Sequence, residues 1–140
     1  MRTLSVVMLT GAVLLLSAAP VKGHHAFAAE FDANKPITLK GVVTKMEWVN
    51  PHMWMYVDVK DPSGTVVTWA VEGGAPNALF RRGFRKDSLP IGIEVTVEGY
   101  QAKSGKAVIN GRNVVYPNGT KLFMGSSGTG APGDSPNDPR

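Results

Sequence analysis

The sequence predicts a mainly β fold, and three observations support that expectation. Segments rich in β-branched residues recur between residues 37 and 124, separated by Gly, Pro and Asn-Gly turn signals. One short helical segment, Asn77–Arg82, follows the third of them. The resulting order, β-β-β-α-β-β, is that of a small five-stranded OB-like barrel with one short helix between strands three and four. A small open sandwich with the same elements is the alternative.

The chain divides into four expected segments. Residues 1–23 have the positively charged start, apolar run and small residues of a signal peptide. An N-terminal arm spans 24–36, the OB-like β-barrel domain spans 37–124, and a disordered tail rich in Gly, Ser, Pro and Asp spans 125–140. Cleavage after Gly23 leaves one domain with one core and no stable membrane span. We therefore expect a bacterial protein that is periplasmic or secreted.

The first two expected strands meet at Asn50-Pro51. The first is a long strand over residues 37–48, in which Gly41 marks a bend or bulge. The second, His52–Lys60, alternates between two faces. Its core face carries Met53, Met55, Val57 and Val59, and its outer face carries His52, Trp54, Tyr56 and Asp58.

A hairpin and the helix follow. Asp61-Pro-Ser-Gly64 favours a tight turn, after which residues 65–72 return as the third strand. Gly73-Gly74-Ala75-Pro76 then interrupts the sheet. Its proline suits the first turn of a helix and Gly83 suits the helix end, so we expect the short helix between them.

The remaining strands are short. Residues 94–100 predict the fourth strand and residues 107–116 the fifth, with a turn at 103–105. Asn118-Gly119 is a hairpin signal before a last extended segment over 120–124. Closing such a sheet into a barrel removes exposed edges that would pair with other chains.

Composition excludes several classes of function. The chain has no cysteine, which excludes disulfides and thiolate chemistry. It carries 15 basic and 11 acidic residues, and loss of Arg2 and Lys22 with the leader lowers the net charge from +4 to +2. That small charge and the expected export argue against a nucleic-acid partner. The motifs of serine hydrolases, zinc proteases and phosphate-binding loops are missing from the sequence, so we expect no enzyme activity.

The histidines carry the leading functional hypothesis. His24 and His25 stand at the expected new terminus, and His52 is the third histidine of the chain. A terminal histidine offers its α-amine and its imidazole to one metal ion, and nitrogen ligands in a tetragonal arrangement favour Cu(II). We therefore expect a non-enzymatic protein that binds copper or another divalent metal through His24, His25 and His52.

Two neighbours are expected to support this metal site from outside. Antiparallel pairing of the second and third strands brings His52 near Glu72, unless the register slips by one residue. Glu72 and Asn50 would then orient the ligands. The methionines beside His52 are turned toward the core by strand alternation. The alternative is structural: His52 caps a turn, and His24-His25 is a polar end without a metal.

A metal-free binding module is the rival hypothesis. Trp54 and Tyr56, on the outer face of a barrel, are suited to stack on sugar rings. The structural alternative is that the arm covers them, because its Phe27 and Phe31 need a surface to pack against. The other two tryptophans, Trp48 and Trp69, are expected in the core.

The densest basic run offers the same module an anionic ligand. It contains Arg81, Arg82 and Arg85, and clustered cations attract anions. The partner would be a glycan, an anionic ligand or an envelope protein. The structural alternative is a solvated helix end, where the helix dipole favours cations.

Several of these motifs resemble a family of small exported bacterial proteins classed as a domain of unknown function. The resemblance rests on HHxF at His24–Phe27 and NPHxW at Asn50–Trp54, and it covers residues 24–124. Further matching segments are Phe31-Asp32, Gly41-Val42-Val43, and residues 69–73, 79–83 and 95–100. The resemblance implies an exported single-domain protein, and the barrel is similar to other periplasmic OB-type binding domains. It implies no substrate and no activity.

Overall fold

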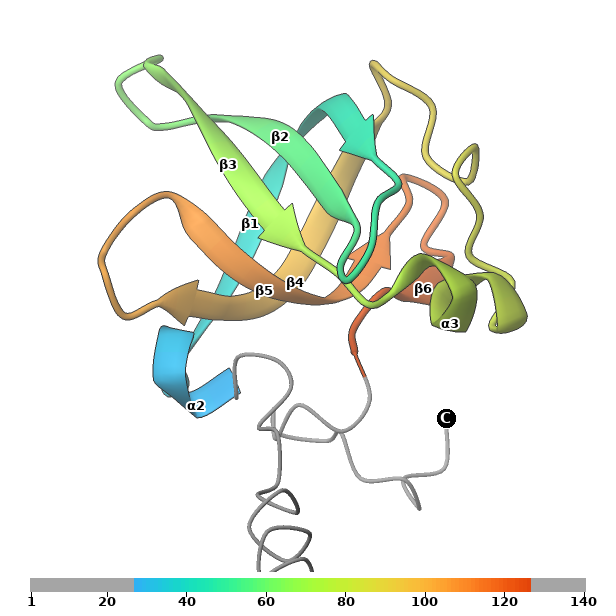
Figure 1. Ribbon diagram of the computed structural model, residues 1–140. Coiled ribbons are helices and arrows are strands. Elements are labelled where there is room, and N and C mark those ends of the chain that lie inside the picture. Colours follow the sequence, from blue (N-terminus) through green and yellow to red (C-terminus); the bar gives the residue numbers. More distant parts are fainter. Residues whose placement is uncertain (1–26, 127–140) are drawn as a thin grey trace, which may run out of the picture.

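The computed structural model describes residues 27–126, which form two short helices and six strands (Figure 1). In chain order these are α2 (Phe27–Glu30), β1 (Phe31–Glu47), β2 (Trp54–Lys60), β3 (Val66–Glu72), α3 (Pro76–Arg81), β4 (Glu94–Ala102), β5 (Val108–Val115) and β6 (Lys121–Phe123). The protein is therefore mainly β, as the sequence predicts, but it has six strands where five were predicted, because Lys121–Phe123 pairs with β5 as a further strand. No helix within residues 27–126 is long and apolar enough to cross a membrane.

The strands form one sheet in the order β3-β2-β1-β4-β5-β6, in which all neighbours are antiparallel. β3 also pairs with β5, and this pairing is parallel. The pairings therefore run from β1 through β2, β3, β5 and β4 back to β1. β6 pairs with β5 on the side away from β4. Figure 1 shows β3 and β5 side by side, with β1 and β4 behind them.

β1 is the strand that both halves of the sheet share. Its first part pairs with β4, its last part pairs with β2, and Val42 has a partner on each. Gly41 precedes this change of partner. A Cβ at Gly41 would lie 2.3 Å from the backbone oxygen of Asp58, so only glycine permits this close approach. The sequence predicted a bend or bulge at Gly41, and the register shift of this strand lies further along, between Val43 and Lys45.

β1 begins at Phe31, whereas the sequence predicted an arm up to residue 36. Phe31 pairs with Ala102 and Pro36 with Tyr100, with an irregular register between them. The reason is that β4 extends to Ala102 and offers its backbone to this segment. The sequence missed it because a proline and a local turn signal interrupt the β pattern there.

The main core draws on β1 to β5 and on α3. Residues with no exposed surface are Val43, Met53, Met55, Val57, Val71, Leu79, Phe84, Val97, Ile109, Val114 and Met124. The predicted alternation of β2 is confirmed, because Met53, Met55 and Val57 are buried while Trp54 and Tyr56 are half-buried on the other face. Trp48 and Trp69 pack against this core, as expected.

A smaller apolar cluster lies outside the main core, where α2 packs against β4 and β5. The Phe27 ring lies 5.4 Å from the Tyr100 ring, edge to face, and 5.8 Å from the Phe31 ring. Ala102 and Val108 complete the cluster. The interpretation that Phe27 and Phe31 cover Trp54 and Tyr56 is therefore wrong, because the start of β1 pairs with β4 and directs both rings away from β2.

α3 lies close to its predicted place. It begins at Pro76, and the backbone amide of Gly83, at φ 85°, donates to the Phe80 carbonyl at its end. The predicted roles of the proline and the glycine are confirmed. The ends of strands β2 to β5 also lie within two residues of the predicted ends.

Candidate functional site

The candidate site lies where β2 begins and β3 ends. The Asn50–Pro51 peptide bond, immediately before His52, is cis. The amide of Met53 donates to the Gly74 carbonyl at 3.1 Å, and the amide of Gly73 donates to the Met53 carbonyl at 2.9 Å. These two bonds extend the β2–β3 pairing to the residues around His52 and Glu72.

His52 and Glu72 are in direct contact, through the imidazole Nδ1 and the carboxylate Oε1. Their side chains are 17% and 8% exposed. The predicted register is therefore confirmed, with both residues on the outer face. The contact fixes the imidazole with Nδ1 toward β3, as carboxylates do for many metal-binding histidines.

Trp54 and Tyr56 continue this outer face along β2. Trp54 is the strand partner of both Glu47 and Glu72. The Tyr56 hydroxyl donates to Glu47 at 3.2 Å, and the Lys45 ammonium lies 5.1 Å from the Tyr56 ring centroid. Burial, followed by the Glu47 carboxylate, raises the pKa of Tyr56, and the hydrogen bond from Lys45 lowers the pKa of Glu47. A cation of the protein itself therefore lies over Tyr56.

His24 and His25 lie outside the described residues, so their approach to His52 stays a prediction. Within residues 27–126 no three His, Asp or Glu side chains are grouped to hold a metal ion. A metal site with three such ligands that includes His52 would therefore need at least one ligand from outside residues 27–126.

The described chain starts two strands away from the His52–Glu72 pair. Phe27 packs on Tyr100 of β4. Tyr100 is the strand partner of Asn110 on β5, and Asn110 is the strand partner of Glu72 on β3. Asn110 and Glu72 are both 6% exposed. Val71 lies in the main core, so Glu72 faces outward, toward the same side as the Phe27 cluster.

An open hollow of about 510 Å³ adjoins the Asn50–Pro51 bond, and its lining residues are Trp48, Asn50, Pro76, Asn77, Phe80 and Arg81. The Trp48 ring stacks on Phe84, with centroids 6.1 Å apart and planes 5° from parallel. The Phe80 side chain is an exposed aromatic, 57% accessible. Asn50 is thus placed in the hollow, and its supporting role beside His52 stays a prediction.

The three arginines of the basic run take different positions. Arg81 lines the hollow, and the Arg85 guanidinium lies 5.1 Å from the Phe80 ring centroid. Arg82 donates to the Gly125 carbonyl at 3.2 Å and lies over the Phe123 ring. Arg82 therefore fastens the C-terminal segment to α3, whereas Arg81 and Arg85 flank Phe80.

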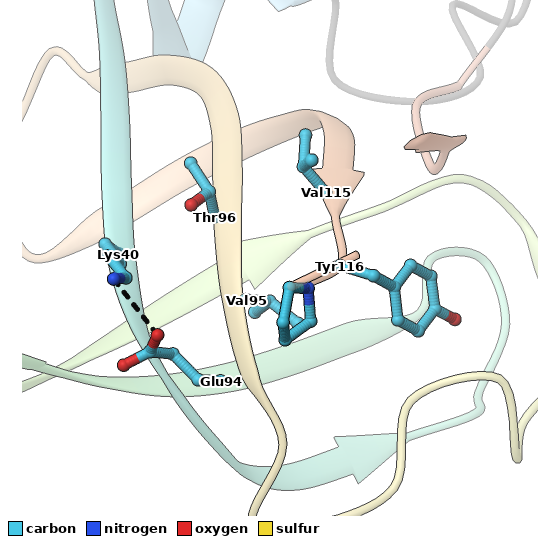
Figure 2. A pocket seen from close by; sticks show the side chains of 7 residues that line it. Lys40, Glu94, Val95, Thr96, Val115 and Tyr116 are labelled. Atoms are coloured by element: carbon cyan, nitrogen blue, oxygen red, sulfur yellow. Dashed lines mark ion pairs between the residues drawn. The ribbon is translucent and has the colours of Figure 1, made fainter. Parts of the chain in front are cut away.

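A second pocket, of about 230 Å³, lies across β1, β4 and the end of β5 (Figure 2). Its lining residues are Lys40, Glu94, Val95, Thr96, Val115, Tyr116 and Pro117. Lys40 and Glu94 pair with each other at 3.0 Å on the surface, and the Tyr116 hydroxyl donates to the Ser88 carbonyl. Because Lys40, Glu94 and Tyr116 already have partners within the fold, this pocket is a weaker candidate site.

Sequence reasoning missed Pro76, Asn77 and Phe80 as residues of the hollow. A signal for Phe80 was present. Leu79 and Phe80 are adjacent in a helix of six residues, and neighbouring helical side chains point about 100° apart. Only one of the two can face the core, and Leu79 does so with no exposed surface.

Comparison with known proteins gives a family and no function. No curated protein and no solved structure matches the chain. Residues 12–111, more than half of the 140-residue chain, match a family of unknown function, DUF6152. The matched region includes all three histidines and Glu72. The chain therefore belongs to this family of unknown function.

Proposed function

We propose that the protein is an exported, non-catalytic metal-binding protein of the bacterial periplasm. Its ligand is copper or another divalent metal, bound by His24, His25 and His52. The observation that carries the proposal is the contact between His52 Nδ1 and Glu72 on the outer face of β2 and β3.

The His52–Glu72 contact has the form of a histidine prepared for a metal. A ligating imidazole commonly gives its other N–H to a carboxylate, which fixes the ring and makes it a better donor. With Nδ1 toward Glu72, the metal binds at Nε2. Glu72 is almost fully buried, so this carboxylate acts from behind the ring and is not itself a ligand.

The place where the described chain starts supports a contribution from the amino terminus. His24 precedes Phe27 by three residues, and three extended residues span about 10 Å. From Tyr100, on which Phe27 packs, two strand-to-strand steps lead to Glu72. Those two steps also amount to about 10 Å. The length of the arm therefore suits a shared site.

The proposed ligand set determines the metal. After cleavage behind Gly23, His24 supplies an α-amine and an imidazole, and His25 and His52 supply further nitrogen atoms. Nitrogen ligands of this kind favour Cu(II) among the divalent metals. Met53 is buried in the core, so its thioether does not add a ligand that prefers Cu(I).

The scaffold for this site is an OB-like barrel. The support is the circuit of pairings through β1, β2, β3, β5 and β4, together with a short helix between β3 and β4. This is the element order of OB-type barrels.

Native mass spectrometry of protein isolated from the periplasm tests the proposal. The mature chain should start at His24 and bind one Cu(II). Three alanines inserted before His24 should weaken Cu(II) binding at least about tenfold, because the amine is displaced from its imidazole and no histidine stands at the third position of the new terminus. The matched control is three alanines added after Arg140, which should change nothing. Absence of bound metal at micromolar copper, or equal binding by the two extended proteins, would contradict the proposal.

A further inference from the structure

We infer that the hollow between Trp48 and Phe80 is a separate binding site for an acidic sugar, a pyranose ring that carries a carboxylate. The inference does not rest on the proposed metal site, although Asn50, which is expected to support His52, also lines this hollow. The inference rests on the shape of the hollow, its two aromatic walls and the charge of its rim.

The walls of the hollow suit a flat, ring-shaped ligand. Trp48 comes from the chain after β1 and Phe80 from α3, so the two rings belong to different elements. Trp48 is held from behind by Phe84, at 6.1 Å between centroids, so it does not need to be ordered by the ligand. The volume of about 510 Å³ is within the range of small-molecule sites.

The rim supplies the polar groups that a sugar needs. Asn50 and Asn77 are exposed amides that line the hollow, and each amide both donates and accepts hydrogen bonds, as hydroxyl groups require. A few polar groups around an apolar floor are the usual composition of a specific small-molecule site.

The charge of the rim selects an anion. Arg81 is the charged residue of the lining, and the Arg85 guanidinium lies over the ring of Phe80. A guanidinium matches a carboxylate with two parallel hydrogen bonds, which adds direction as well as charge. An inorganic anion alone would leave Trp48 and Phe80 unused, whereas a uronate ring uses both the aromatic walls and the arginine.

The inference places the sugar at this hollow and not on the outer face of β2, because the Tyr56 hydroxyl is already engaged by Glu47. A cation lies 5.1 Å from the Tyr56 ring and from the Phe80 ring alike, so this contact does not distinguish the two surfaces. The aromatic residues that line an open hollow are Trp48 and Phe80. Of the predicted basic run, Arg81 lines the hollow and Arg85 lies over the Phe80 ring.

The test is a calorimetric titration of the mature protein with tetragalacturonate, compared with the neutral tetrasaccharide maltotetraose. Wild-type protein should bind the acidic probe saturably and the neutral one at least about tenfold more weakly, as expected for loss of a charge-assisted hydrogen bond. Arg81→Gln should remove that preference. Lys86→Gln, an exposed basic residue of the same region that does not line the hollow, is the matched control and should keep it.

Phe80→Ala separates stacking from charge. Because Phe80 is an exposed side chain, its removal should leave the fold intact, as far-UV circular dichroism would verify, and should weaken both probes. Three results would overturn the inference: no saturable binding of tetragalacturonate at millimolar concentration, equal binding of the two probes, or equal loss in Arg81→Gln and Lys86→Gln.

Discussion

His52 Nδ1 contacts Glu72 Oε1, and this contact joins the start of β2 to the end of β3. It brings the imidazole of His52 onto a carboxylate whose side chain is 8% exposed. A nearly buried carboxylate needs partners, because water cannot solvate it. The contact therefore has a structural consequence even when no metal is bound.

His52→Ala should destabilise the metal-free protein by about 1–3 kcal/mol, the usual cost of removing one hydrogen-bond partner from a buried group. His52→Asn, which keeps a side-chain donor, should cost less. Urea denaturation in the presence of a chelator measures both. Equal unfolding midpoints for wild type and His52→Ala would show that Glu72 does not rely on this contact.

Phe27→Ala should weaken copper binding without unfolding the main core. Phe27, 3% exposed, fastens the arm to Tyr100, and loss of an anchor raises the entropic cost of ordering the terminal ligands. The expected loss of Cu(II) affinity is about tenfold for one lost constraint. Phe80→Ala removes an exposed ring of the same size and should leave copper affinity unchanged. Equal affinities in Phe27→Ala and Phe80→Ala would contradict the proposed role of the arm.

Glu98 should contribute to stability in a pH-dependent way. Its carboxylate pairs with Lys121 of β6 at 2.8 Å and accepts a hydrogen bond from Asn113 of β5 at 2.9 Å. The hydrogen bond from Lys121, helped by Asn113 and opposed by burial, holds the pKa of Glu98 below its ordinary value of 4.5. Because the folded-state pKa is the lower one, the contribution is complete above pH 4.5 and is lost as the pH falls through the folded-state value.

The measurement for Glu98 is the urea midpoint at neutral pH and at several acidic pH values. Below pH 4.5 the stability of wild type should fall with decreasing pH, and the stability of Glu98→Gln should fall less steeply. Glu94→Gln is the control, since it removes a carboxylate from an exposed pair with Lys40. A wild-type decline that Glu98→Gln retains in full would refute this prediction.

Gly74→Ala should destabilise the end of β3 by about 1–3 kcal/mol through overpacking. A Cβ at Gly74 would lie 2.7 Å from the Gly125 carbonyl oxygen and 3.3 Å from Leu79. The Gly74 amide also donates to the Met124 carbonyl at 2.8 Å, so the backbone cannot easily move away. Thermal unfolding measures the effect. Gly83→Asn, at an open position with φ 85°, is the comparison and should be nearly neutral.

The fold was largely predictable because its local signals agree with its pairings. Alternation over residues 52–60 places Met53 inside and His52 outside. The turn before β3 fixes a register that brings His52 to Glu72. Pro76 and Gly83 mark the two ends of α3 in the sequence. Proline fixes a φ angle that suits the first turn of a helix, and glycine readily adopts the positive φ found after its last turn.

The parts that could not be predicted depend on long-range contacts. The course of the arm depends on the length of β4, because Phe31 pairs with Ala102 at the end of that strand. No local pattern in residues 31–36 reveals this partner. The hollow forms only when α3 folds back beside Trp48. Local periodicity contains no information on which distant residues line a hollow together with Phe80.

The most direct test of the metal proposal is the Cu(II) affinity of the mature protein and of His52→Ala, measured by competition with a chelator. If His52 shares one ion with the terminal histidines, the variant should bind Cu(II) at least about tenfold more weakly, because it loses a direct ligand and even the loss of a supporting group typically costs that much. His24→Ala should show a comparable loss, and the double variant should lose less than the sum of the two. Equal affinities of wild type and His52→Ala would contradict the proposal, because copper would then be bound without His52.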